Sequence, residues 1–231
     1  MSTLTPQLNR RAVFFFAALL LLALPAFWPS YLFPPKPIPE TRVHLHGLFM
    51  VAWMVLLIVQ GGLIRGGNRP LHRALGRVSY VLVPLIVAST LGVLHLRLNQ
   101  KIDAELLYFL YIILSLTAVF AFSYVMAMRN RGTPAIHARY MICTALALVD
   151  PILGRFVFFH AGIEPPGMQV VTYAVVDAIL LWLAYRDRGS GIRVFPFMLA
   201  VFVTVQIPTF FIFQLAWWPR FAQWLAALPL P

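Results

Sequence analysis

Apolar residues fill almost the whole chain in seven long runs, and short polar segments separate the runs. A helix rises about 1.5 Å per residue, so about 20 residues cross the roughly 30 Å of hydrocarbon in a bilayer. The runs reach or approach this length, which predicts an all-α integral membrane bundle of seven transmembrane helices in a single domain over residues 1–231. The predicted spans cover residues 11–28, 43–64, 74–97, 105–128, 136–160, 168–186 and 192–217.

The basic residues of the connections predict how the bundle is oriented. Short loops with an excess of Lys and Arg stay on the cytoplasmic side. A cytoplasmic N-terminus places twelve of the 18 basic residues inside and leaves the C-terminus outside. These twelve are Arg10, Arg11, Arg65, Arg69, Arg73, Arg77, Arg129, Arg131, Arg139, Arg186, Arg188 and Arg193.

Composition and charge agree with a membrane protein. The chain is 61% hydrophobic and 11% charged, whereas about a quarter of the residues of a soluble domain are charged. The net charge of +11 could indicate nucleic-acid binding. However, the charges are spread over short loops beside the membrane, where they set topology and contact anionic lipid heads. We therefore predict that the chain contacts the lipid bilayer and binds no nucleic acid. The sequence does not decide whether other membrane subunits bind to it.

Two features modify the helical pattern. Asp150-Pro151 stands near the middle of the fifth span. Proline removes a backbone hydrogen bond, the residue before it avoids the helical region, and aspartate is a favoured helix N-cap. We therefore expect the fifth helix to be kinked or broken there. The aromatic tail 218–231 is weakly amphipathic and is expected to lie along the outer interface.

Three ionisable residues lie inside the fifth and sixth spans, namely Asp150, Arg155 and Asp177. A charge at the bilayer centre costs roughly 3 kcal/mol or more unless it is paired or hydrated. The three residues could form an ion-paired or proton-sharing cluster, which would suit a proton-coupled transporter. A structural Asp–Arg pair that joins two helices explains them equally well.

The six histidines all lie near span ends. Imidazole binds metals and haem iron, and helical bundles place such ligands on facing helices. Histidines on the outer sides of the second, third and fifth spans could therefore form a three-ligand site for a transition metal. The candidate ligands are His44, His46, His95 and His160 on the outer side and His72 and His137 on the inner side.

Haem b is the alternative ligand for these histidines. His46 or His160 with His95 could hold one haem, and His72 with His137 a second. The histidines at the two ends of one helix stand about 35 Å apart, which is wider than the hydrocarbon. Interfacial histidines also serve as plain amphipathic anchors.

Two stretches resemble a group of uncharacterised bacterial polytopic inner-membrane proteins. One contains His-Leu-His-Gly at 44–47, followed by a tryptophan, a glutamine and Leu-His-Arg-Ala-Leu-Gly at 71–76. The other contains His-Ala-Arg-Tyr-Met at 137–141, followed by Asp-Pro and an arginine. The resemblance covers roughly 43–160. It implies a multi-pass protein of the bacterial inner membrane, with the outer side in the periplasm, and it attaches no activity. It singles out His46, His72, His137, Asp150 and Arg155.

Several functional hypotheses follow from these patterns. The leading one is a membrane-embedded haem or metal protein with a redox or electron-transfer role. The second is the proton-coupled transporter, and the third is a non-catalytic subunit of a membrane complex. A zinc hydrolase that uses three outer histidines ranks lower, because no acidic residue stands in a helical motif beside them. No pattern assigns catalytic residues, so the sequence favours neither an enzyme nor a non-enzyme.

Overall fold

The structure is a computed structural model that describes residues 4–35, 38, 40–100 and 102–228, with side chains from residue 11 onward. Over these residues it contains helices and no strands, which confirms the all-α prediction. Short π or 3-10 turns are η1 (Trp28–Leu32), η2 (Arg188–Ser190), η3 (Ile207–Phe210) and η4 (Ile212–Gln214). The α-helices are α1 (Leu4–Phe27), α2 (Thr41–Arg65), α3 (Arg69–Gly76), α4 (Ser79–Leu98), α5 (Ala104–Arg129), α6 (Pro134–Leu146), α7 (Val149–Ala161), α8 (Gly167–Asp187), α9 (Val194–Gln206) and α10 (Trp218–Ala226).

Six helical stretches of the described chain are long and apolar enough to cross a membrane. They cover residues 11–32, 41–65, 69–98, 104–129, 134–161 and 167–190. The sequence predicted a seventh span at 192–217, but there the apolar helix is shorter and extends from Val194 to Phe210. Pro208 lacks an N–H and its ring clashes with a carbonyl one turn earlier, so α9 gives way to the 3-10 turns η3 and η4. These helices identify the chain as a multi-pass membrane protein.

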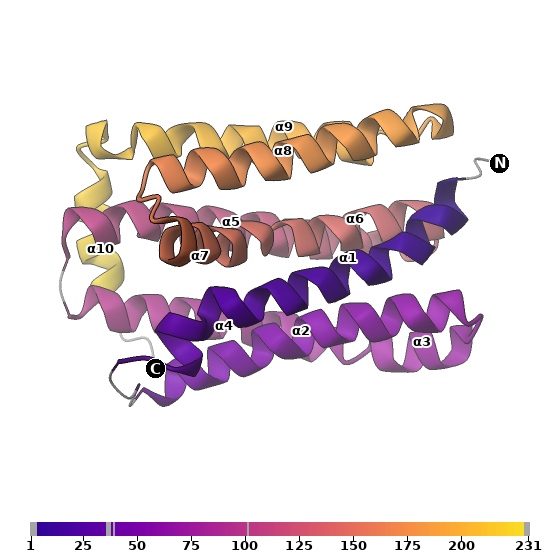
Figure 1. The fold of residues 1–231 in the computed structure, drawn as a ribbon, viewed down its shortest axis with the longest axis horizontal. Helices are drawn as coiled ribbons and strands as arrows, with labels where there is room; N and C mark the ends of the chain where they lie inside the picture. The colour runs from indigo at the N-terminus through magenta and orange to yellow at the C-terminus, as the bar shows by residue number, and fades with distance from the viewer. Residues whose placement is uncertain (1–3, 36–37, 39, 101, 229–231) are drawn as a thin grey trace.

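The helices run along one long axis, so the bundle has two distinct ends (Figure 1). At one end lie the start of α1, the α2–α3, α5–α6 and α8–α9 connections, and most arginines of the loops; we call it the arginine-rich end. At the other lie the α4–α5 and α7–α8 loops and α10, and we call it the α10 end. The first described helix therefore begins at the arginine-rich end, and the last one, α10, lies at the opposite end.

The fifth predicted span is interrupted earlier than the sequence indicated. Helix α6 ends at Leu146 and α7 begins at Val149. The two residues between them keep right-handed helical dihedral angles. Pro151 lies in the first turn of α7 rather than at its start. A proline there disturbs no helical hydrogen bond, because the first N–H groups of a helix have no partner within the helix.

Helix α10 is part of the bundle rather than a free interfacial helix. Its residues Trp218, Ala222 and Leu225 are buried against α4 and α5. The Trp218 indole N–H donates to the carbonyl of Leu107 at 2.9 Å. The tail thus packs across the end of the bundle, as a helix that does not cross it. Residues 229–231 of the predicted tail lie outside the described residues.

Helices α1 and α2 approach closely at Gly61. A Cβ built on Gly61 would lie 2.6 Å from Cγ2 of Val13, whereas a Cβ on the neighbouring Gly62 would meet nothing within 4 Å. Small residues let membrane helices come this close. The pair offers a matched test of the packing, because both glycines sit in the same turn.

Alanine at position 61 is therefore expected to destabilise the protein by roughly 1–3 kcal/mol through overpacking. Gly62→Ala should instead stabilise it by up to about 1 kcal/mol, because alanine has the higher helix propensity. Thermal unfolding in mild detergent measures both. Equal midpoints for the two variants would show that α1 and α2 do not touch at Gly61.

Candidate functional site

A buried carboxyl stands in the first turn of α7, within the spanning stretch 134–161. Asp150 is 4% exposed, and its carboxyl accepts a hydrogen bond from the hydroxyl of Thr172 on α8. Among the described residues no basic side chain forms an ion pair with it. A negative charge is favoured near a helix N-terminus, which partly explains why this position tolerates an aspartate. Asp150 is thus a buried acid held by a neutral partner.

Asp150 belongs to a polar network because α8 presents a polar face to it. Gln169, Thr172 and Tyr173 recur at the spacing that places side chains on one side of a helix, and all three are buried. The Gln169 backbone carbonyl lies 3.2 Å from the Thr172 hydroxyl, and the Gln169 side-chain oxygen accepts from the hydroxyl of Tyr108 on α5 at 3.0 Å.

The same face of α8 also reaches the chain beyond α9. The Tyr173 hydroxyl lies 2.9 Å from the hydroxyl of Thr209 in η3, which is 1% exposed. Asp150 lies within electrostatic range of both Tyr108 and Tyr173. The network therefore joins α5, α7, α8 and η3 around a single carboxyl.

A cavity at the α10 end meets this network. Its volume is about 290 Å³. Tyr108 and Thr209 line the cavity and also belong to the network. The remaining lining residues are Ala104, Glu105, Pro165, Pro166, Phe210 and Phe213. Polar side chains therefore lie between this cavity and Asp150, and the hydroxyl of Thr172 is the group that donates to the carboxyl.

The other two members of the predicted charge cluster lie apart from this network. Asp177 accepts a hydrogen bond from Gln206 of α9 at 3.1 Å. The Arg155 guanidinium donates to the carbonyl of Pro151 at 2.8 Å and sits 4.6 Å from the centre of the Phe27 ring. Arg155 acts on Asp150 electrostatically without direct contact. The three residues therefore do not form one hydrogen-bonded cluster. Asp150 instead bonds to Thr172, a neutral residue that the sequence did not single out.

The outer histidines do not converge. His46 lies 3.2 Å from the hydroxyl of Ser89, and His44 lies 3.0 Å from that of Tyr31. His95 and His160 pair with backbone carbonyls, those of Ala226 and Pro25 respectively. In the described part of the chain, no three His, Cys, Asp or Glu side chains could share a metal ion. The described outer histidines therefore do not come together as a three-ligand site.

The inner histidines lie nearer to each other. His72 and His137 are within electrostatic range. The Nδ1 atom of His137 lies 2.9 Å from the carbonyl of Ala127, and the Nδ1 atom of His72 has no hydrogen-bond partner in the described residues. Binding of haem or a transition metal stays a prediction of the sequence.

A buried ion pair joins α6 and α8 near the arginine-rich end. Arg139 is 0% exposed, and its guanidinium donates hydrogen bonds to both carboxylate oxygens of Asp187, one of them from Nε at 2.6 Å. A third bond runs from Arg139 to the carbonyl of Ala135. The sequence counted Arg139 among the twelve basic residues on the cytoplasmic side and did not predict its partner, because the pair forms only when the side chain turns into the bundle to meet Asp187.

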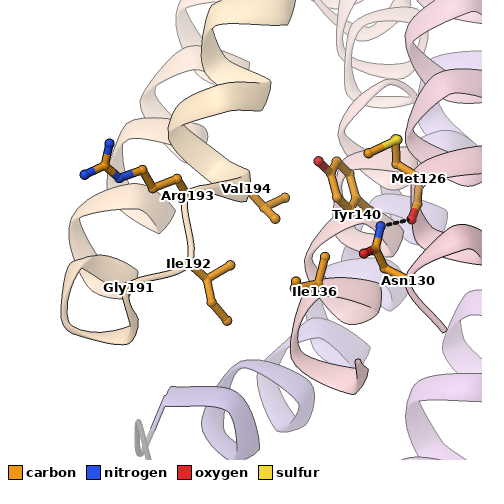
Figure 2. Close-up of a pocket in the computed structure, with 8 residues that line it drawn as sticks. All are labelled: Met126, Asn130, Ile136, Tyr140, Gly191, Ile192, Arg193 and Val194. Carbon is orange, nitrogen blue, oxygen red and sulfur yellow. Dashed lines mark hydrogen bonds between the residues drawn. The ribbon is translucent and has the colours of Figure 1, made fainter. Parts of the chain in front are cut away.

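A second cavity, of about 380 Å³, opens near this ion pair between the α5–α6 connection and the start of α9 (Figure 2). Its wall is mostly apolar. The Asn130 amide donates to the carbonyl of Met126 at 2.8 Å, and the Arg193 side chain points away from Tyr140 and Asn130. Both cavities have mostly apolar walls, and the cavity at the α10 end is distinguished because Tyr108 and Thr209 line it and also belong to the polar side chains around Asp150.

Comparison of the chain with family models, curated proteins and solved structures finds no match. The function must accordingly be argued from the geometry of the site itself.

Proposed function

We propose that this multi-pass membrane protein is a proton-coupled carrier in which Asp150 is the central proton acceptor. The observation that carries the proposal is that two residues lining the cavity at the α10 end belong to the group of polar side chains around a buried carboxyl. Tyr108 and Thr209 line the cavity, and the network that contains them includes Thr172, which donates to Asp150. The polar group therefore extends from the cavity to a carboxyl buried within a spanning stretch.

The chemistry of the network supports proton exchange. Hydroxyl groups both donate and accept hydrogen bonds, so Thr172 can bond to Asp150 in either protonation state, and Tyr108 and Thr209 can bond to water in the cavity. An ionised carboxylate without a cationic partner is costly at the bilayer centre. Loss or gain of a proton at Asp150 therefore changes the energy of the surrounding helices, which is what coupling requires.

The cavity supports a small cationic cargo beside the proton. Its volume of about 290 Å³ holds several waters, each of which takes roughly 30 Å³ in the liquid. Glu105 contributes a negative charge, and Tyr108 and Phe213 stack with ring centres 6.1 Å apart. Aromatic faces and a carboxylate attract cations.

We further propose that the arginine-rich end faces the cytoplasm of a bacterial inner membrane and the α10 end the periplasm. The excess of loop arginines at one end supports this orientation. Helix α9 with η3 would then serve as a seventh crossing, so that the two termini face opposite compartments. Reporters fused to the two termini test this, and activity of both in one compartment would contradict it.

Proton movement into proteoliposomes tests the proposed function. Protein reconstituted in vesicles that hold a pH-sensitive dye should pass protons, under an imposed pH gradient with the potential clamped, faster than vesicles without protein. Choline in the external buffer should change the rate of proton entry if a small cation is coupled to the proton. An unchanged rate would show that protons move without choline. Equal rates with and without protein would remove the proposal.

A further inference from the structure

A second group of buried polar side chains lies on α2, α3 and α5 and takes no part in the Asp150 network. Four of its members carry polar atoms without a hydrogen-bond partner among the described residues, namely the indole N–H of Trp53, both amide atoms of Gln60, Nδ1 of His72 and the hydroxyl oxygen of Ser123. Trp53 and Ser123 are 0% exposed and Gln60 is 9% exposed. Buried polar groups in proteins are almost always satisfied, so each of these groups calls for a partner.

The midplane part of the group is held together by aromatic contacts. Trp53 lies near the middle of α2, and its ring packs edge-on against Phe120 and Tyr124 of α5 at 5.4 and 5.8 Å. Ser123 stands between these two residues in sequence. The unpartnered indole N–H and the unpartnered hydroxyl therefore belong to one contact region between α2 and α5.

The group continues from there towards the arginine-rich end. The Tyr124 hydroxyl lies 2.9 Å from that of Ser79, and Ser79 donates to the carbonyl of Gly76 at 2.6 Å. A Cβ on Gly76 would lie 3.7 Å from the amide nitrogen of Gln60. Gln60 is two helical turns from Trp53 on the same face of α2, and His72 lies on the adjoining α3. Polar groups thus extend from α3 to mid-membrane depth.

We propose that Trp53, Gln60 and Ser123 line a water-filled path that enters the bundle beside α3 and ends at mid-membrane depth. Water fits these groups because it both donates and accepts, and buried waters typically bond to two to four polar partners. This inference rests on the proposed function, because the path would be the second half of the route that protons take through the protein. Protons would reach Asp150 from the α10 end, and this path would bring water into the bundle from the arginine-rich end.

Cysteine accessibility tests the path without measuring flux. In a Cys143→Ala background, Ser123→Cys and Gln60→Cys are labelled with a charged, membrane-impermeant thiosulfonate added from each side in turn. Val119→Cys and Met54→Cys are the controls, since they replace buried apolar residues of the same helices and Met54 lies off the face of α2 that Trp53 and Gln60 share. A thiol reacts as its thiolate and is inert in apolar surroundings, so only cysteines beside water should react.

We expect the Ser123 and Gln60 variants to react at least about tenfold faster than their controls, and only from the arginine-rich end. Ser123→Cys nearly preserves shape, and Gln60→Cys provides a second position should one variant fold poorly. Labelling at the rate of the controls, or labelling only from the α10 end, would overturn the path. A flux that survives loss of the Asp150 carboxyl, together with rapid labelling, would remove the proposed function and leave the path intact.

Discussion

Asparagine in place of Asp150 is expected to slow proton entry into proteoliposomes by on the order of 100-fold, which is the scale of effect when a positioned proton acceptor is removed. Asparagine keeps the size of the side chain and a carbonyl oxygen that can accept from Thr172. It cannot take up a proton. The loss of flux should therefore occur without loss of the fold, as a thermal midpoint close to that of the wild type would show.

Asp177→Asn provides the matched control for this prediction. Asp177 is also a carboxyl within the sixth spanning stretch, but it is only half-buried and bonds to Gln206 rather than to the network. Its variant should pass protons within about twofold of the wild-type rate, a difference worth less than 0.5 kcal/mol. Equal rates of proton entry for Asp150→Asn and the wild type would show that Asp150 has no role in transport.

Alanine in place of Arg139 is expected to lower the free energy of unfolding by about 3–5 kcal/mol, because Asp187 would remain as an uncompensated buried charge. Asp187 is 4% exposed and Arg139 binds both of its carboxylate oxygens. The double variant Arg139→Met with Asp187→Leu should recover most of the loss, since apolar residues of similar volume can replace a buried pair.

Arg193 supplies the control for the ion pair. It lies at the same end of the bundle, but its side chain is exposed and points away from its neighbours, so Arg193→Ala should change stability by no more than about 0.5 kcal/mol. Denaturant or thermal unfolding in detergent measures all three variants. An Arg139→Ala protein as stable as Arg193→Ala would show that the pair does not hold α6 and α8 together.

Hydrophobic length was enough to predict most of the fold. A stretch of about 20 apolar residues has few alternatives to a spanning helix, and six predicted spans correspond to long apolar helices. The seventh predicted span is shorter in the structure, because its helix gives way to 3-10 turns around Pro208, and the length of the apolar run did not predict this. The break in the fifth span was predicted from Asp150-Pro151, yet proline is tolerated within a first turn, and the interruption lies at Ala147 and Leu148.

The site was less predictable, because it depends on which helix faces meet. Asp150 could be found, since a mid-span carboxyl is rare and costly. Its partners could not, because Thr172 and Tyr108 are ordinary residues until α5, α7 and α8 are packed together. The run Gln169, Thr172 and Tyr173 was a usable signal, as a polar face at helical spacing beside the loop that joins α7 to α8.

The histidines and Arg139 show the opposite difficulty. Their residue types suggested ligands and topology signals, whereas most of the histidines pair with hydroxyls or backbone carbonyls and Arg139 pairs with Asp187. Such local partners cannot be distinguished from ligand roles by spacing along the chain. Only the packing of distant segments, such as α10 against α4 beside His95, decides between them.

Infrared spectroscopy of the reconstituted protein tests most directly whether Asp150 exchanges a proton inside the bundle. A carboxylic-acid band should appear and disappear reversibly as the pH is changed, and it should be absent in Asp150→Asn and present in Asp177→Asn. A spectrum in which no band depends on both pH and Asp150 would contradict the account.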